Sequence, residues 1–201
     1  INIHLYSYQY EMEDPTSFSV DAADIQETDG YKYGRQVYQD EKYRVIDFKG
    51  IEVFKNVSHI HFACALVNGE RGYVKNFKYL STLKIDSIGI TFSDRNYNLN
   101  QLKGLKYISF VACENFNLKF DKKSKVESIR LLDSKGKVDV SNLKTLKTFS
   151  SYETIFKKIK FGKNAKLKKL SIDGSAYCIN KKIRKLDISK MKNLRYLYLQ
   201  S

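Results

Sequence analysis

The chain has 201 residues, of which 42% are hydrophobic and 29% charged, and its formal net charge is +14 at pH 7. A chain of this length can bury a full core without metal or disulfide support, and its composition is too apolar and too aromatic for a disordered protein. No apolar run reaches the ~18 residues that indicate a membrane-spanning helix, so we expect no membrane span.

Residues 1–42 differ in composition from the rest of the chain. Tyr6, Tyr8 and Tyr10 alternate with other residues, which is typical of a β-strand, and a segment rich in acidic residues follows them. The repeats that come next would expose apolar surface at an uncovered end. We therefore expect residues 1–42 to form an N-terminal cap of strands and loops.

An apolar triplet recurs from residue 57 onward, with its second member three positions after the first and its third two positions later. The copies are Val57/Ile60/Phe62, Leu80/Leu83/Ile85, Leu105/Ile108/Phe110, Val126/Ile129/Leu131, Leu146/Phe149/Ser151, Leu167/Leu170/Ile172 and Leu194/Leu197/Leu199. Their starts lie 23, 25, 21, 20, 21 and 27 residues apart, within the range of ~20 to 29 residues for a leucine-rich repeat. Tyr43, Ile46 and Phe48 form an incomplete earlier copy, which gives about seven to eight repeats in residues 43–201.

The second and third members of each triplet lie two positions apart, so they project from one face of a short strand into a core. Each unit is too small to bury its apolar side alone, and successive units therefore stack, strand beside parallel strand. The sequence predicts a leucine-rich-repeat solenoid of the mostly β or α/β class, with a parallel sheet on its concave face.

Leucine-rich repeats often place a polar residue three positions after the third apolar residue, where its side chain bonds to the backbone of the turn. In this chain those positions are Ala65, Ile88, Cys113, Ser134, Thr154 and Ser175. Cys113 and the three hydroxyl residues fit the pattern, whereas Ala65 and Ile88 do not. We therefore expect the first turns to be less regular than the later ones.

The segment VIDFKGIEVFKNVSHIHF, from Val45 to Phe62, resembles the opening repeat of internalin-type bacterial leucine-rich-repeat proteins. The segment KLDISKMKNLRYLYLQ, from Lys185 to Gln200, resembles the same broad class. This resemblance implies a secreted or surface-attached binding protein, often an adhesin, that uses its concave face. The chain begins with Ile1, and we expect that a leader has been removed and that the protein is extracellular or attached to the cell surface of a bacterium.

The candidate ligand-binding residues are the outward residues of the stacked strands. They are His59, His61, Lys84, Tyr107, Ser109, Val111, Arg130, Leu132, Tyr152, Lys169, Tyr196 and Tyr198. Tyrosine is enriched at recognition surfaces because it offers a large contact area at a low entropic cost. We expect the centre of the contact to consist of Tyr107, Val111, Arg130, Leu132 and Tyr152, with a protein or a glycan as ligand. The alternative interpretation is that these tyrosines only support the sheet through cross-strand pairing.

Catalytic and metal sites are not predicted. His59 and His61 lie two apart on one strand, but the neighbouring Lys84 and Thr82 cannot complete a zinc site. The cysteines, Cys64, Cys113 and Cys178, lack a CxxC pairing, and Cys113 is best explained as a small buried residue. The chain has no GxSxG, HExxH, GxGxxG or GxxxxGK[ST] motif, and we expect neither enzymatic activity nor a cofactor.

The charge is unevenly distributed. Residues 1–100 carry 11 Lys and Arg against 14 Asp and Glu, net −3, whereas residues 101–201 carry 25 against 8, net +17. Lysine pairs recur at 122–123, 157–158, 168–169 and 181–182, and stacking would align some of them as a basic stripe. The alternative function is therefore a scaffold that binds a polyanion through the lysine-rich C-terminal half. Sequence-specific nucleic-acid recognition is not expected, and the lysines can also serve solubility alone.

The last triplet, Leu194 to Leu199, would form an exposed edge strand, which readily pairs with another chain. We therefore expect either that the natural protein continues beyond Ser201 or that this edge meets a partner. A third interpretation follows from the first case, in which these residues are a structural or regulatory module of a longer protein.

Overall fold

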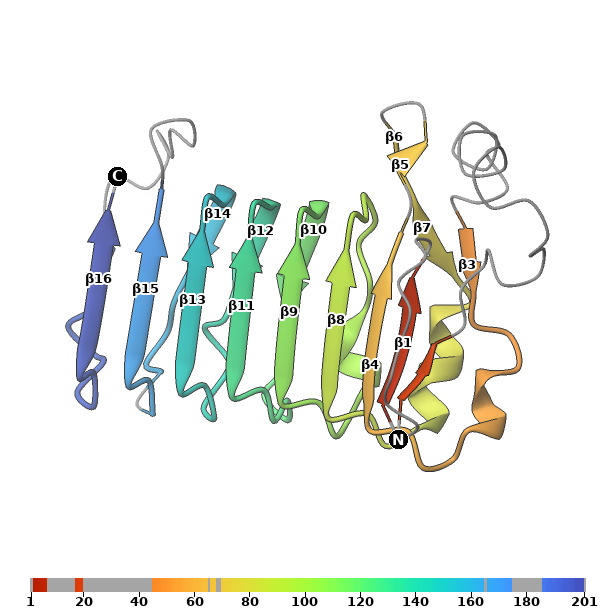
Figure 1. Ribbon diagram of the computed structural model, residues 1–201. Coiled ribbons are helices and arrows are strands. Elements are labelled where there is room, and N and C mark those ends of the chain that lie inside the picture. The colour runs from red at the N-terminus through yellow and green to blue at the C-terminus, as the bar shows by residue number, and fades with distance from the viewer. Residues whose placement is uncertain are drawn as a thin grey trace.

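The computed structural model describes residues 2–6, 17–19, 45–64, 66–67, 70–164, 166–174 and 186–200. Its main element is a nine-stranded sheet in which every pairing is parallel (Figure 1). In spatial order the strands are β16 (Tyr196–Gln200), β15 (Lys169–Asp173), β13 (Thr148–Tyr152), β11 (Ser128–Leu132), β9 (Tyr107–Val111), β8 (Ser87–Thr91), β4 (His59–Ala63), β1 (Asn2–Tyr6) and β2 (Ser17–Ser19).

A second, three-stranded parallel sheet lies behind the first in Figure 1. It consists of β10 (Glu114–Lys119), β12 (Lys135–Asp139) and β14 (Ile155–Lys160). Two small sheets pair β3 (Val45–Asp47) with β7 (Tyr73–Lys75), and β5 (Leu66–Val67) with β6 (Glu70–Arg71). Among the described residues the helices are short 3-10 turns, η2 (Ile51–Val53), η3 (Phe77–Thr82) and η4 (Leu99–Gln101), and none of them is long and apolar enough to cross a membrane.

The strands from β4 to β16 stack in the order of the chain, and equivalent residues of successive strands are register partners. Ile60 pairs with Ile88, Ile88 with Ile108, and Ile108 with Ile129. The buried rows continue through Phe149 and Leu170, so that each unit covers the apolar side of its neighbours. The prediction of a mostly β architecture built from parallel strands is confirmed.

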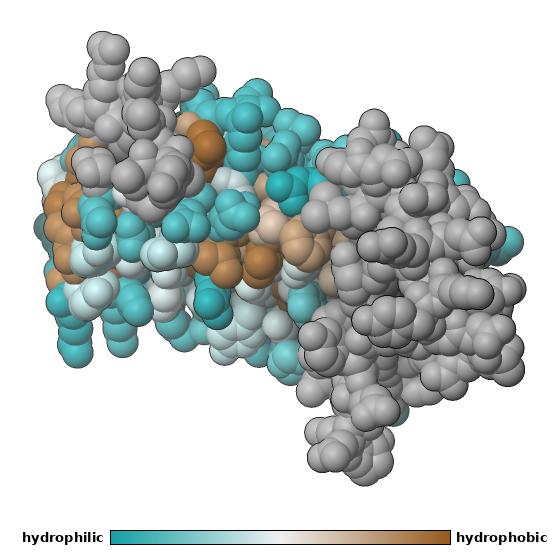
Figure 2. Space-filling model, turned by 45° about the horizontal axis from the view of Figure 1, so that its top comes forward, coloured by the Kyte–Doolittle hydropathy of each residue, from teal (hydrophilic) through white to brown (hydrophobic). Residues whose placement is uncertain are grey.

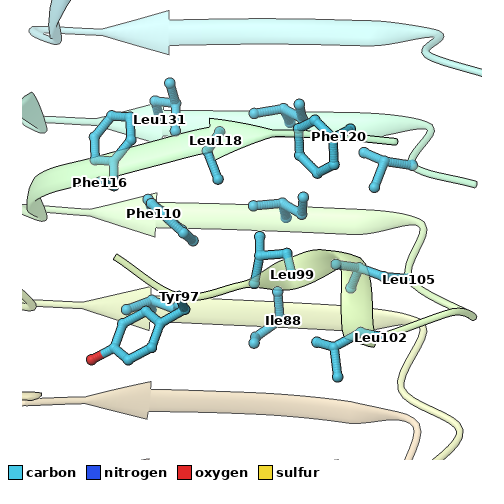
Figure 3. Close-up of a cluster of buried hydrophobic side chains, with 14 of the residues drawn as sticks. Ile88, Tyr97, Leu99, Leu102, Leu105, Phe110, Phe116, Leu118, Phe120 and Leu131 are labelled. Atoms are coloured by element: carbon cyan, nitrogen blue, oxygen red, sulfur yellow. The ribbon is translucent and has the colours of Figure 1, made fainter. Parts of the chain in front are cut away.

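The core lies between the two sheets. Figure 3 shows Ile88, Phe110 and Leu131 projecting from the nine-stranded sheet toward β10 and η4. Phe116 and Leu118 of β10 close this layer from the other side, and the rings of Phe110 and Phe116 meet edge to face at 5.5 Å. The burial pattern of β10 alternates between exposed and buried residues, as in a strand with one face on a core.

A repeated turn ends the strands of the middle units. Phe92, Ala112, Asp133 and Glu153 all adopt positive φ, between 44° and 55°, and each is followed by a buried polar residue or cysteine. Those residues are Ser93, Cys113, Ser134 and Thr154. The Ser134 hydroxyl accepts a hydrogen bond from the Cys113 N–H at 3.1 Å and donates one to the Leu132 carbonyl at 2.7 Å. The predicted polar turn position is thus occupied at Cys113, Ser134 and Thr154.

The second predicted triplet, Leu80/Leu83/Ile85, is wrong. Ile85 begins the triplet, and Ile88 and Ile90 of β8 take the places predicted for Leu83 and Ile85. Leu80 is buried because η3 turns it toward the core, and the helix spacing of three residues imitates the strand pattern. With this correction Ser93, not Ile88, occupies the polar turn position, while Ala65 and Ser175 lie outside the described residues.

The prediction that Tyr43, Ile46 and Phe48 form an earlier repeat of the same stack is also wrong. Ile46 lies in β3, which pairs with β7 in a separate sheet, and Tyr43 lies outside the described residues. The place beside β4 is taken by β1, whose Asn2 to Tyr6 pair with His59 to Ala63. The segment predicted as a cap therefore contributes two strands to the nine-stranded sheet. Tyr8 and Tyr10 are outside the described residues.

Candidate ligand-binding face

The outward residues of the nine-stranded sheet form three rows, which we call the outer face. From β4 to β16 the first row is His59, Ser87, Tyr107, Ser128, Thr148, Lys169 and Tyr196. The second row is His61, Gly89, Ser109, Arg130, Ser150, Ser171 and Tyr198, and the third is Ala63, Thr91, Val111, Leu132, Tyr152, Asp173 and Gln200. The sequence predicts that this face is concave.

Three residues of the predicted contact centre are direct neighbours in the third row. Val111 pairs with Leu132, and Leu132 pairs with Tyr152, so they form a continuous strip with both aliphatic side chains half-buried. Figure 2 shows hydrophobic surface over the middle of the stack and again at its β16 end, with polar surface around it. The strip is rimmed by polar groups, as is common at interaction sites.

Tyr152 forms one end of this strip, and Tyr107 lies four residues before Val111 on the same strand. Both tyrosines extend into solvent. Their exposed fractions are 46% and 48%. The neighbours of Tyr107 in its row are Ser87 and Ser128, which are too small to support a tyrosine ring by cross-strand packing. Tyr107 is therefore not packed between large side chains of its own row.

The predicted centre is broad. Tyr107 and Tyr152 are separated by two strand spacings and by four residues along the strand, which corresponds to about 10 Å by about 13 Å. A ligand that touches both rings at once must therefore span about 16 Å.

Charged groups flank the strip. Arg130 is exposed in the second row, between Ser109 and Ser150. The charge of Glu153 and its hydrogen bond raise the pKa of the Tyr152 hydroxyl, so this group remains a proton donor well into the alkaline range. The centre of the face thus combines a cation, an apolar strip and a phenolic donor.

The β16 side of the face carries a second aromatic group. The ammonium of Lys169 lies 5.1 Å from the centre of the Tyr196 ring, within cation–π range. The Tyr198 hydroxyl donates a hydrogen bond to Oε1 of Gln200. Lys169 thus lies two strands away from Leu132, and Tyr196 and Tyr198 lie three strands away from it.

Lys84 does not belong to the outer face. It precedes β8 as an exposed residue of the turn, and Gly89 takes the position beside His61. A Cβ atom at Gly89 would lie 2.6 Å from Cδ2 of His61, because the imidazole ring covers this glycine. The sequence predicts Lys84 on this face because the second predicted triplet is Leu80/Leu83/Ile85, and not Ile85/Ile88/Ile90.

The two predicted histidines lie on β4, and both bond to neighbouring side chains. His59 Nδ1 lies 2.9 Å from the Ser58 hydroxyl and 3.5 Å from Asp86 Oδ1, and His61 Nε2 lies 3.0 Å from the Thr91 hydroxyl. The third histidine of the chain, His4, is the register partner of His61 on β1, a long-range pairing that the local sequence does not signal. The described residues contain no group of three metal-binding side chains.

Cys64 and Cys113 are free thiols in the core beneath the turn of β4, β8 and β9. Burial raises the pKa of Cys113 to about 11 and raises that of Cys64 further. Both side chains are therefore protonated at neutral pH and are poor nucleophiles. Cys178 lies outside the described residues.

Two cavities of about 430 and 440 Å³ lie away from the outer face. Their walls are rich in asparagine, but several of these amides bond to the backbone of the next unit. Asn100 Nδ2 donates to the Lys119 carbonyl at 3.0 Å, and Asn142 Nδ2 donates to the Phe120 carbonyl at 2.9 Å. These side chains connect units of the stack, and the outer face remains the better candidate site.

Comparisons with protein-family models, with curated proteins and with solved structures give no match.

Proposed function

We propose that this protein is a non-catalytic binding protein built from leucine-rich repeats, and that it is secreted by a bacterium or attached to the bacterial surface. It binds a protein or glycan ligand on its outer face. The in-register parallel strands, the apolar triplets and the polar turn residues support the leucine-rich-repeat assignment. The resemblance of Val45 to Phe62 to internalin-type repeats supports the location and the adhesin-like role.

The exposure of Tyr152, at one end of the apolar strip, and of Tyr107, on the same strand as Val111, carries this proposal. Both rings are held on regular strands, β9 and β13, so little conformational entropy is lost when they bind. Truncating two such anchors lowers binding free energy by about 2–4 kcal/mol, roughly 30-fold or more in Kd.

The ligand can be captured from the face itself. A photo-crosslinking amino acid replaces Ser109, which lies at the centre of the outer face, and in a second variant it replaces Val53, a 69% exposed residue of η2. Each variant is exposed to cell surfaces and to a glycan array. We expect a crosslinked species at Ser109 that is absent at Val53.

The captured ligand is then titrated against the wild type, the Tyr107→Ala/Tyr152→Ala double variant and a Val53→Ala control. The double variant should bind at least about 30-fold more weakly, whereas the control should bind like the wild type. If the double variant loses stability but keeps its affinity, the tyrosines only support the sheet and the proposal fails.

A further inference from the structure

The outward side of the three-stranded sheet consists largely of lysine. Phe116, Leu118, Val138 and Phe156 point into the core, and most of the other positions of the same strands are exposed. Lys157 and Lys158 are both exposed because the register shifts between β12 and β14 at this point. The exposed lysines are Lys119, Lys135, Lys137, Lys157, Lys158 and Lys160, which we call the lysine face. Because the core separates the two sheets, the lysine face and the outer face look in opposite directions.

The register places several of these cations next to one another. Lys137 pairs with Lys158, and residues paired across a sheet lie about 5 Å apart. Lys157 crosses toward β10, where its ammonium donates a hydrogen bond to Oδ1 of Asn115 at 2.8 Å. Neighbouring ammonium groups repel each other, so an anion between them is favoured.

Few carboxylates oppose this charge. Glu114 lies 3.4 Å from Arg71, and Asp139 lies 3.8 Å from Lys160 and accepts hydrogen bonds from the N–H and hydroxyl of Ser141. Partial burial raises the pKa of Asp139, but the Ser141 hydrogen bonds and the charges of Lys160 and Lys158 hold it below its usual value. Among the described residues, Lys135, Lys137 and Lys158 are in no ion pair.

We propose that the lysine face is a second binding site, and that its ligand is a sulfated polysaccharide. This site goes beyond the proposed function, because it uses a different sheet and needs no residue of the outer face. Asn115 and Asn117 lie among the lysines and can hydrogen-bond to sugar hydroxyls and sulfates.

The composition of the face favours a polysaccharide over other polyanions. The aromatic residues of β10, β12 and β14 are Phe116 and Phe156, both buried, so nucleic-acid bases have no ring to stack on. These strands contain no arginine, whose planar guanidinium forms paired hydrogen bonds to bases and phosphates. Lysine instead acts as a point charge, which favours neutralisation of sulfates over specific recognition of bases or phosphates. Their exposed positions hold lysine and asparagine, so no large apolar side chain is fully exposed there to enter a lipid layer.

The test uses a heparin oligosaccharide of defined length, titrated against the whole chain at several salt concentrations. About six neutralised lysines predict a fall in affinity of roughly 1,000-fold between 50 and 200 mM salt. In Lys137→Gln/Lys158→Gln/Lys160→Gln the Kd at 100 mM salt should rise by about 30- to 100-fold, and the slope of log Kd against log salt should fall by about 2.

The matched control is Lys55→Gln/Lys103→Gln/Lys125→Gln. It removes the same charge from exposed turns that precede strands of the nine-stranded sheet. Its Kd should change by less than about 3-fold, because distant charges are screened at this ionic strength. Tyr107→Ala/Tyr152→Ala should bind heparin like the wild type, which keeps this test separate from that of the outer face.

Three results would overturn the proposal. The first is the absence of heparin binding by the wild type, and the second is an equal loss of affinity in the lysine-face variant and the matched control. The third is tighter binding, at equal ligand charge, of a single-stranded oligonucleotide or of phosphatidylserine vesicles. Circular dichroism of each variant confirms that the fold is kept.

Discussion

The middle of the stack and its β16 end carry the same apolar triplet but bury it to different extents. Leu170 of β15 and Leu197 of β16 are register partners, and their exposed fractions are 0% and 45%. Ile172 and Leu199, which are register partners two residues further along the same strands, are 7% and 51% exposed. In a repeat protein, burial therefore depends on the presence of a neighbour on both sides, and the triplet alone does not determine it.

The two regions also offer different surfaces for binding. Within the described chain β16 is the last strand of the nine-stranded sheet, so its far edge presents unpaired backbone groups beside two exposed leucines. The middle units expose instead the outer face, whose strands β9, β11 and β13 are each paired on both sides, and the lysine face, in which β12 is paired on both sides. Both proposed sites therefore lie mainly on the middle units of the stack.

Truncation of the paired leucines should give the largest contrast. Leu170→Ala removes a fully buried side chain and should lower the free energy of unfolding by about 3 kcal/mol. Leu197→Ala removes a half-exposed one and should lower it by less than about 1 kcal/mol. Urea titrations followed by circular dichroism measure both values. Equal losses in the two variants would show that β16 is buried in solution.

The sequence predicts the strands well where the triplet stands alone. Six of its seven copies begin where the structure places a strand and its preceding turn, for example Leu105, Val126 and Leu146, because period-two burial is a local property. The second copy fails because Leu80, in a 3-10 helix, and Leu83, the residue directly after that helix, are both buried at the same three-residue spacing. For the site, the error moved Lys84 onto the outer face in place of Gly89.

Two further features could not be predicted from the local pattern. The pairing of β1 with β4 joins residues more than fifty positions apart, and no nearby residue specifies it. The three-stranded sheet does leave a signal, since Phe116, Leu118 and Phe120 alternate with polar residues directly after a turn. Lysine pairs such as 157–158 draw attention to charge, but only the register of β12 and β14 shows which lysines share a face.

A methyl group added between the stacked middle units should have an intermediate effect. A Cβ atom at Gly136 of β12 would lie 2.5 Å from the Phe116 carbonyl oxygen and 2.6 Å from its ring, so Gly136→Ala forces the two units apart. We expect a loss of about 1–3 kcal/mol, measured by the same titration. Lys135→Ala, at the neighbouring exposed position, is the control and should change stability by less than about 0.5 kcal/mol. A Gly136→Ala variant as stable as this control would contradict the close packing of β10 against β12.

The smallest effect should come from the one polar residue in an otherwise apolar buried row. Ser151 takes the place of Leu131 and Ile172 in its row, it is buried, and its hydroxyl has no hydrogen-bond partner. Ser151→Ala removes an unpaired polar atom from the core and should raise the free energy of unfolding by about 1 kcal/mol. Ser150→Ala, one residue away on the outer face, should change it by less than about 0.5 kcal/mol. Every other middle unit fills this position with a larger apolar side chain, so the surroundings of the Ser151 hydroxyl are apolar. A loss of stability in Ser151→Ala would mean that this hydroxyl is hydrogen-bonded in solution, and that water or another polar group reaches the core at this point.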